Sequence, residues 1–280
     1  MFQNSIFAAG FFAPMRYLLI FVVLLSAASC GEYNQVLKSN DPEYKYSKAL
    51  EYFEAGDCYR ALPIFEELIG VTRGTQRAEQ VYYYYAHVHY CIGDYYLANY
   101  YFKNFAKTYS TSEFAEECMF LAAMCNYNLS PNSTLDQQDT QAAIDEFQLY
   151  LNKFPNSEKV DSCYKLIGDL NLKLEKKAFD IASLYVKTEK HKAAVIALEN
   201  MLNDYPGTVY TEDVMFLIIK SHFSYAERSI EMKKLERYEA CTKSYYNFAA
   251  RFPDSGNLKE AESFFKRSVK AMEKLEVATN

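Results

Sequence analysis

Small and aromatic residues recur in a fixed order along most of the chain. Five small residues are each followed four positions later by a large apolar one: Ala61 by Phe65, Ala98 by Phe102, Ala143 by Phe147, Ala194 by Leu198 and Cys241 by Tyr245. Residues i and i+4 lie one above the other on a helix face. The pattern predicts five helices in which the small residue lets a neighbouring helix approach and the large one fills the next layer.

Each of these helices is predicted to have a partner helix just before it. Another alanine stands twelve residues upstream in three copies, at Ala49, Ala86 and Ala182. In the first two copies the two helices are separated by glycine followed by aspartate, at 56–57 and 93–94. Glycine is typical of the end of one helix, and aspartate is typical of the cap that starts the next. Proline closes the last three copies, at Pro155, Pro206 and Pro253. The sequence thus predicts five helix pairs over 43–255 and a closing helix near 258–275.

The copies are not of equal length. The small residues of successive copies are 37, 45, 51 and 47 positions apart, so the later copies carry insertions. Residues 129–140 are polar and predict a loop, whereas 160–187 contain no breaker beyond Gly168 and predict one long helix. Pro63 lies inside an expected helix and is predicted to kink that helix or delay its start.

This pattern of small residues, aromatic residues and closing prolines resembles the tetratricopeptide repeat, a helix–turn–helix unit of about 34 residues. The resemblance implies an all-α fold, a right-handed superhelical solenoid of about five such helix pairs. Composition agrees, because only 9 Gly and 7 Pro occur in 280 residues, too few for the turns of an all-β protein or for phosphate-binding loops.

The start of the chain has the features of an export signal. Arg16 precedes the apolar run 17–25, and small residues lead from it to Cys30. This order resembles a bacterial lipobox, in which the cysteine is lipidated and becomes the new N-terminus. A membrane-spanning anchor is the alternative, although the apolar run is short for a span. The expected organisation is a signal peptide at 1–29, a lipidated tether at 30–42 and the repeat domain at 43–280.

No catalytic, cofactor or metal site is predicted. The chain has no HExxH, GxSxG, Walker or GxGxxG motif. His87 and His89 are two apart on a helix and point in different directions, so they cannot share a metal ion. The net charge of −6 and the lack of a basic stripe argue against nucleic acid as a partner. We therefore do not expect an enzyme.

Six cysteines follow Cys30, at 58, 91, 118, 125, 163 and 241. An exported chain can pair them, and the sequence leaves open which pairs form, if any. Cys118 and Cys125 share a predicted helix face, where free cysteine commonly serves as a small buried apolar residue. That is the interpretation we favour for these two.

Tyrosine is unusually frequent, with 26 copies, and it gathers on the first helices of the first two repeats. Tetratricopeptide folds line their concave face with first-helix positions. By that resemblance the candidate peptide-binding groove consists of Tyr46, Leu50, Phe53, Tyr83, His87 and Tyr90. Tyrosine suits such a groove because it combines apolar area with a polar tip. The alternative is that most of these tyrosines pack between repeats.

The order of lipobox, polar insertion and long helix is similar to that of the BamD family, lipoprotein subunits of the outer-membrane β-barrel assembly machinery. Matching stretches are 46–57, 139–147, 176–185 and 193–206. The resemblance implies an outer-membrane lipoprotein that faces the periplasm and is anchored by lipid (palmitate) on Cys30. It also implies a BamA-like barrel subunit bound by the C-terminal repeats and unfolded outer-membrane proteins bound by the N-terminal ones. Another periplasmic tetratricopeptide lipoprotein, serving cell-wall or division enzymes, is the alternative.

Overall fold

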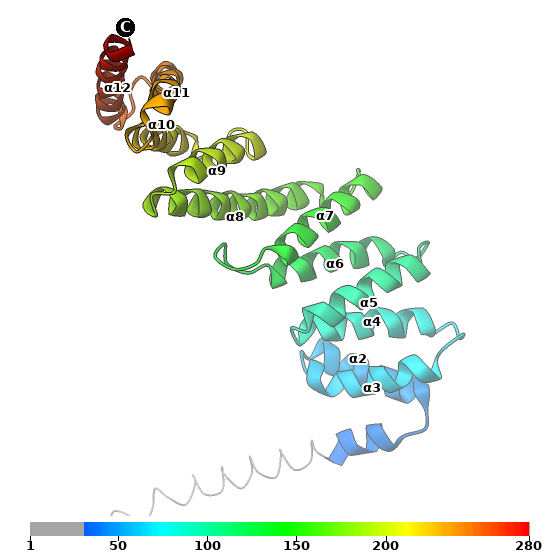
Figure 1. Cartoon of the computed structure of the whole chain (residues 1–280). Helices are drawn as coiled ribbons and strands as arrows, with labels where there is room; N and C mark the ends of the chain where they lie inside the picture. Colours follow the sequence, from blue (N-terminus) through cyan, green and yellow to red (C-terminus); the bar gives the residue numbers. More distant parts are fainter. Residues whose placement is uncertain (1–30, 280) are drawn as a thin grey trace, which may run out of the picture. The chain divides into compact units, whose positions relative to one another are not determined.

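The computed structural model describes residues 31–279, and over this range the regular structure is entirely helical. The elements after a first helix at 31–38 are α2 (Pro42–Glu54), α3 (Cys58–Val71), α4 (Ala78–Cys91), α5 (Tyr95–Thr108), α6 (Ala115–Leu129), α7 (Gln138–Lys153), α8 (Val160–Lys187), α9 (His191–Asp204), α10 (Thr211–Glu227), α11 (Glu231–Arg251) and α12 (Leu258–Thr279) (Figure 1).

The predicted all-α fold of helix pairs is confirmed. The pairs are α2–α3, α4–α5, α6–α7, α8–α9 and α10–α11, and α12 is the closing helix. Helix α8 runs over Val160–Lys187, the bounds predicted for the long helix, and a loop separates α6 from α7 at the polar insertion. Helix α3 already begins at Cys58, so Pro63 lies inside it and does not delay its start. Pro63 is exposed, which places its ring on the solvent side of the helix.

Helix ends in the first two pairs follow the predicted turn chemistry. Gly56 and Gly93 have φ values of 76° and 80°, the left-handed region that glycine enters without steric cost. The aspartate after each glycine caps the next helix: Asp57 accepts a hydrogen bond from the backbone N–H of Arg60, and Asp94 accepts one from that of Leu97. These turns therefore fix where α3 and α5 start.

A hydroxyl residue precedes the first helix of each later pair and also the closing helix α12. The side-chain oxygens of Thr75, Ser112, Ser157, Thr208 and Ser255 each accept from the backbone N–H two residues on, at 3.0–3.3 Å. Each bond satisfies a donor that the helix start would otherwise leave unpaired. Ser112 also donates to Glu79 at 2.5 Å, which links the third pair to the second, and Ser255 donates to Glu212 at 2.6 Å, which links the start of α12 to α10.

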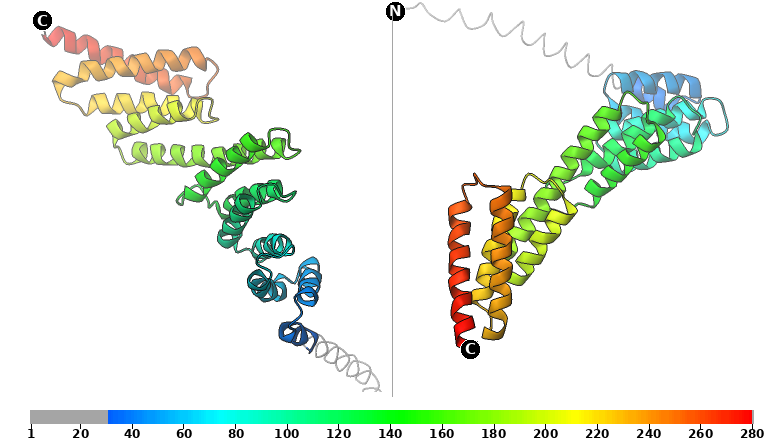
Figure 2. Two further views of the ribbon diagram at one scale, coloured as in Figure 1. Left: turned by 90° about the vertical axis from the view of Figure 1, so that its right-hand side faces the viewer. Right: turned by 90° about the horizontal axis from the view of Figure 1, so that it is seen from above.

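The described chain divides into two compact units. Residues up to 130, with 141–163, form the first unit, and residues 131–140 with 164 onward form the second. Helix α8 begins in the first unit and continues into the second. Within the first unit α2 to α6 follow one another as neighbours, and within the second α10, α11 and α12 lie side by side (Figure 2).

Both units are held by cores built on the repeated positions. In the first unit Ala61, Ala98 and Ala143 have no exposed surface, and neither have Phe65, Phe102 and Phe147. The second unit buries Ala194, Leu198 and Cys241, whereas Tyr245, the predicted large partner of Cys241, is only partly buried and Phe248 fills the core there. Fully burying one such large side chain contributes roughly 1.5–3 kcal/mol, so these layers are the main source of stability.

The segment predicted as a tether is largely folded. Residues 31–38 form a helix whose Val36 is fully buried against α2 and α3. The Tyr33 ring meets that of Tyr52 edge-on at 5.6 Å, and Glu32 pairs with Lys48 at 2.9 Å. Apolar residues three apart, Tyr33 and Val36, give this short helix one face to bury.

Among the described residues no helix is both long and apolar enough to cross a membrane. The predicted signal peptide at 1–29 and the candidate lipid-attachment residue Cys30 lie outside the described residues.

Candidate functional site

The six residues predicted to form a groove lie on two neighbouring first helices. Tyr46, Leu50 and Phe53 are on α2, and the equivalent residues 37 positions later, Tyr83, His87 and Tyr90, are on α4. The spacing i, i+4, i+7 keeps each set on one helix face. We call these six residues the aromatic surface.

Ring contacts join the two halves of the aromatic surface. The ring centroids of Phe53 and His87 are 6.1 Å apart, and those of His87 and Tyr83 are 4.3 Å apart. Tyr90 continues the row against Phe102 at 6.2 Å. Such edge-on and tilted contacts are the arrangements that aromatic pairs favour.

The six residues differ in how much of their surface is exposed to solvent. Tyr46 and Tyr83 are only 8% and 9% exposed, so they belong mainly to the core, whereas Leu50, Phe53, His87 and Tyr90 are half-buried. Only these four can offer apolar area to a ligand without rearrangement.

Tyrosine hydroxyls of this surface tie successive first helices together. Tyr46 donates to Gln80 of α4 at 3.4 Å, Tyr83 donates to Glu117 of α6 at 2.8 Å, and Tyr90 accepts from Asn128 of α6 at 3.2 Å. Burial raises the pKa of Tyr83, and the hydrogen bond to Glu117 adds to the rise. Burial likewise raises the pKa of Tyr90. Both phenols therefore stay protonated at neutral pH.

His87 serves as an aromatic packing residue. Its ring lies between those of Phe53, Tyr83 and Phe102, and its buried Nε2 has no hydrogen-bond partner. Burial lowers the pKa of His87, so the ring is neutral at pH 7. His89 faces Tyr85 and Tyr101 instead. The two histidines therefore do not converge, and the described residues contain no cluster of three side chains able to hold a metal ion.

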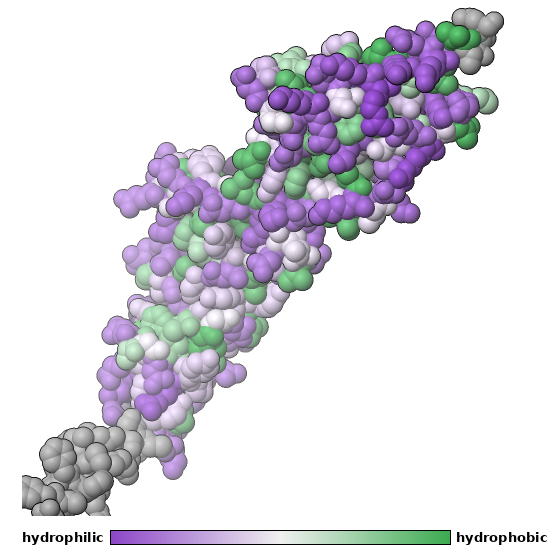
Figure 3. All heavy atoms as spheres, turned by 90° about the vertical axis from the view of Figure 1, so that its left-hand side faces the viewer, coloured by the Kyte–Doolittle hydropathy of each residue, from purple (hydrophilic) through white to green (hydrophobic). Residues whose placement is uncertain are grey.

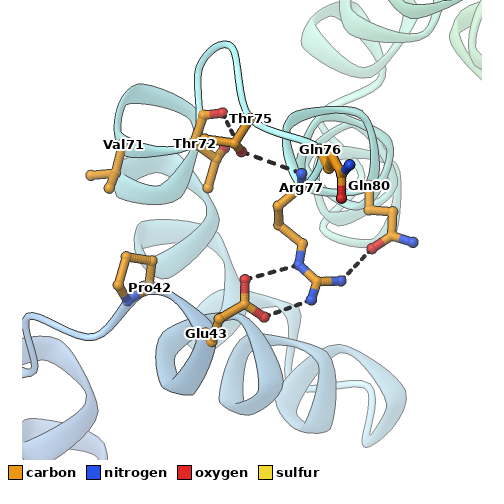
Figure 4. Close-up of a pocket in the computed structure, with 8 residues that line it drawn as sticks. All are labelled: Pro42, Glu43, Val71, Thr72, Thr75, Gln76, Arg77 and Gln80. Atoms are coloured by element: carbon orange, nitrogen blue, oxygen red, sulfur yellow. Dashed lines mark hydrogen bonds and ion pairs between the residues drawn. The ribbon is translucent and has the colours of Figure 1, made fainter.

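A cavity next to the aromatic surface was not predicted from the sequence. It has a volume of about 630 Å³ and lies between the start of α2 and the loop that leads into α4 (Figure 4). The Arg77 guanidinium binds both carboxylate oxygens of Glu43, at 2.6 and 3.2 Å, and donates to Gln80 at 2.6 Å. It also lies 4.5 Å from the Tyr46 ring, which joins the cavity to the surface. In the sequence, the cavity is indicated only by the spacing of Glu43 and Arg77, which are 34 residues apart, the length of one tetratricopeptide repeat.

A second cavity lies in the second unit, where α8 turns into α9. Its volume is about 510 Å³. Ala193, Ile196 and Tyr225 line it, together with the charged residues Lys192 and Arg228. Ile196 is 48% exposed. The wall is mostly apolar, so the cavity can take an apolar side chain of a partner.

The turn beside this second cavity departs from the earlier repeats. Glu189 has a φ of 57° at the place that Gly56 and Gly93 take in the first two pairs. Its carboxylate forms an ion pair with Arg228 at 2.5 Å, which ties the turn to the end of α10. A non-glycine residue held in this region is a local strain that the rest of the structure must offset.

Of the six cysteines at 58–241, two are paired. Cys58 is bonded to Cys91, which joins the start of α3 to the end of α4. Cys118, Cys125, Cys163 and Cys241 are free and buried, which confirms the interpretation of Cys118 and Cys125. Burial raises the pKa of Cys125 to about 12 and that of Cys163 to about 11. These thiols are therefore packing residues and poor nucleophiles.

Hydrophobic residues on the face drawn in Figure 3 are interspersed with hydrophilic ones. Recognition on such a surface depends on a few large side chains, as is usual for protein interfaces.

Comparison with known proteins gives a family match. The model of the family YfiO, described as outer membrane lipoprotein, matches residues 38–240. A relative named outer membrane protein assembly factor BamD, from Pasteurella multocida (strain Pm70), is 22% identical over 187 residues, which cover 63% of this chain and 72% of the relative. The protein of the same name from Rickettsia prowazekii (strain Madrid E) is 28% identical over 104 residues, or 37% of this chain and 41% of that protein.

Among solved structures, the tetratricopeptide domain of P58(IPK) is similar, with a TM-score of 0.40 and 13% identity over 86% of this chain and 69% of that one.

Proposed function

Starting from the fact that this chain belongs to the YfiO family of outer membrane lipoproteins, we propose that it acts in outer membrane protein assembly as a non-enzymatic scaffold and client receptor. In this role the first helix pairs bind unfolded outer-membrane proteins, and the last pairs bind a BamA-like barrel subunit. Lipid on Cys30 holds the protein at the outer membrane, facing the periplasm. The bond between Cys58 and Cys91 is consistent with export to an oxidising compartment.

The observation that carries the client half of this proposal is the aromatic surface. Leu50, Phe53, His87 and Tyr90 are half-buried, lie on two adjacent helices, and are backed by a rigid row of tyrosine hydroxyl bonds. A segment with alternating aromatic side chains presents apolar rings on one side, and such rings fit a surface of this kind. A preformed surface also loses little conformational freedom on binding.

Replacing Phe53 and Tyr90 by alanine is expected to weaken binding of a client segment about tenfold or more, since aromatic anchors at an interface commonly contribute 1–2 kcal/mol each. The probe is a synthetic ten-residue peptide that ends in phenylalanine and carries aromatic residues at alternate positions. Its affinity is measured by fluorescence anisotropy.

Tyr164→Ala is the matched control, because Tyr164 is 63% exposed and lies on α8, in the second unit and not among the residues of the aromatic surface. Circular dichroism verifies that each variant keeps its helices. Equal affinity of the Phe53→Ala/Tyr90→Ala variant and the control would contradict the client half of the proposal.

The partner half rests on the second cavity. Its apolar wall with Ile196 and Tyr225, and the cationic side chains of Lys190 and Lys192 around it, suit a segment that offers one apolar side chain flanked by carboxylates. Such a pocket is the kind of place where a few contacts carry most of a binding free energy.

Ile196→Asp is expected to abolish stable co-purification of the barrel subunit, because it places a charge in the apolar wall of that cavity. The chain, tagged after Asn280, is isolated from detergent-solubilised envelope, and its partners are identified by mass spectrometry. Leu149→Asp is the charge-matched control, because it also replaces an apolar side chain by a carboxylate, at a position of α7 that is 56% exposed.

We expect a large outer-membrane barrel protein to co-purify in near-equal amount with the unaltered chain and with the control. We expect the Ile196→Asp variant to lose it. Recovery of cell-wall or division enzymes in its place would assign the chain to the alternative function.

A further inference from the structure

Three tyrosines of the first unit are among its most exposed large side chains. Tyr59 on α3 is 76% exposed, and Tyr96 and Tyr100 on α5 are 64% and 58% exposed. Tyr59 and Tyr96 come two residues before the fully buried Ala61 and Ala98, which is about 200° round the helix. They therefore point away from the core, on second helices, whereas the aromatic surface lies on first helices.

Tyrosine at this repeat position is confined to the first two helix pairs, although single tyrosines of later pairs, such as Tyr164 and Tyr246, are exposed at other positions. Tyr59 and Tyr96 occupy the same repeat position, and Tyr100 lies one turn beyond Tyr96. The next three pairs carry Gln141, Lys192 and Glu239 at that position. Packing cannot explain the difference, because the position is on the solvent side in the first two pairs. These tyrosines therefore present their side chains to whatever the first pairs face.

The first pairs lie next to the start of the mature chain. The Tyr33 hydroxyl donates to the backbone carbonyl of Arg60 at 3.4 Å, and the Arg60 guanidinium lies over the Tyr33 ring at 5.7 Å. Tyr33 is three residues from Cys30, a span of at most about 10 Å. Tyr59 is the neighbour of Arg60, so a lipid on Cys30 would begin close to the first of the exposed tyrosines.

Because residues 31–38 form a helix that packs on the first unit, the connection between a lipid on Cys30 and the folded unit is short. Val36 is fully buried, and the Glu32–Lys48 ion pair holds the helix against α2 next to Gly31. A flexible tether would let the unit leave the membrane surface, but a docked helix of this kind keeps it within reach of the lipid headgroups.

We propose that Tyr59, Tyr96 and Tyr100 form a membrane-docking face that inserts into the headgroup region of the bilayer that receives the lipid on Cys30. Tyrosine is enriched at membrane–water interfaces, where its ring lies at the headgroup level and its hydroxyl stays hydrated. A second contact beside a lipid anchor also strengthens membrane attachment. The inference rests on the proposed lipid attachment and adds the surface that meets the bilayer.

The absence of tryptophan from the sequence makes this face directly measurable. A single Tyr59→Trp or Tyr96→Trp substitution introduces a unique fluorophore at the proposed face. Val71→Trp is the matched control, because Val71 is 55% exposed and lies at the other end of α3, about 18 Å along the helix from Tyr59. The lipidated chains are reconstituted in vesicles of phosphatidylethanolamine and phosphatidylglycerol that contain lipid brominated near the headgroup.

Bromine quenches only fluorophores that reach the bilayer, so quenching at 59 and 96 is expected to exceed that at 71 by at least about threefold. Equal quenching of the three variants, with all of them co-floating with the vesicles, would overturn the docking face and leave the lipid anchor intact. Failure of the unaltered chain to co-float would instead refute the lipid attachment, and the docking face with it.

Discussion

Replacing both Cys58 and Cys91 by alanine is expected to lower the free energy of unfolding of the first unit by about 3–4 kcal/mol. The two cysteines are 33 residues apart, and a crosslink that closes a loop of this size restricts the unfolded chain by an entropy worth about that much. Alanine suits both positions, since Cys58 is buried and Cys91 is exposed. Urea unfolding followed by circular dichroism measures the change.

The reduced, unaltered chain is the internal control for this loss. Dithiothreitol should lower the stability of the unaltered chain to that of the Cys58→Ala/Cys91→Ala variant and leave the variant unchanged, because the four other cysteines within residues 31–279 are free. Equal stability of the unaltered chain with and without reductant would show that the bond contributes nothing.

The disulfide matters for function because of where it lies. It joins the second helix of the first pair to the first helix of the second pair, and that first helix, α4, carries half of the aromatic surface. A crosslink between consecutive pairs keeps the two halves of the surface in one arrangement before a client arrives, which reduces the entropy lost on binding.

Phe102→Ala is expected to destabilise the first unit by about 3–5 kcal/mol, the usual cost of removing a fully buried aromatic ring. Phe102 has no exposed surface, and its ring contacts those of His87 at 5.1 Å and Tyr90 at 6.2 Å. The substitution therefore opens a cavity directly beneath the aromatic surface. Chemical unfolding measures the loss.

Tyr100→Ala is the matched control on the same helix. Tyr100 is 58% exposed, so its removal in solution should change the free energy of unfolding by no more than about 0.5 kcal/mol. Similar losses for Phe102→Ala and Tyr100→Ala would contradict the assignment of inner and outer faces on α5, on which both the aromatic surface and the membrane-docking face depend.

Much of the fold could be predicted because it depends on local rules. The i, i+4 pairs such as Ala98 and Phe102 mark the inner face of each second helix, and all five helices they predicted are present. The long helix α8 was predicted to its bounds, since no proline or capping pattern interrupts 160–187. The effect of Pro63 was harder to predict, because an exposed proline within a helix is tolerated when its neighbours are well packed.

The candidate site was predicted only in part. Repeat position placed Tyr46 and Tyr83 on the correct helices, but their burial depends on what the next helix brings: Gln80 and Arg77 beside Tyr46, and Glu117 and Phe114 beside Tyr83. The 630 Å³ cavity could not be predicted for the same reason. These contacts of Tyr46 and Tyr83 join residues more than thirty positions apart, and helical periodicity carries no information about them.

The amino-acid sequence by itself determined the helical class, the order and number of the pairs, the turns at Gly56 and Gly93 and the buried role of Cys118, because each follows from the chemistry of neighbouring residues. Only the tertiary structure decided which cysteines pair, which tyrosines are open to a ligand and how residues 31–38 dock. The physical reason is distance along the chain. Short-range patterns fix each helix, whereas the burial of a given side chain depends on which partners the packing of the next pair brings against it.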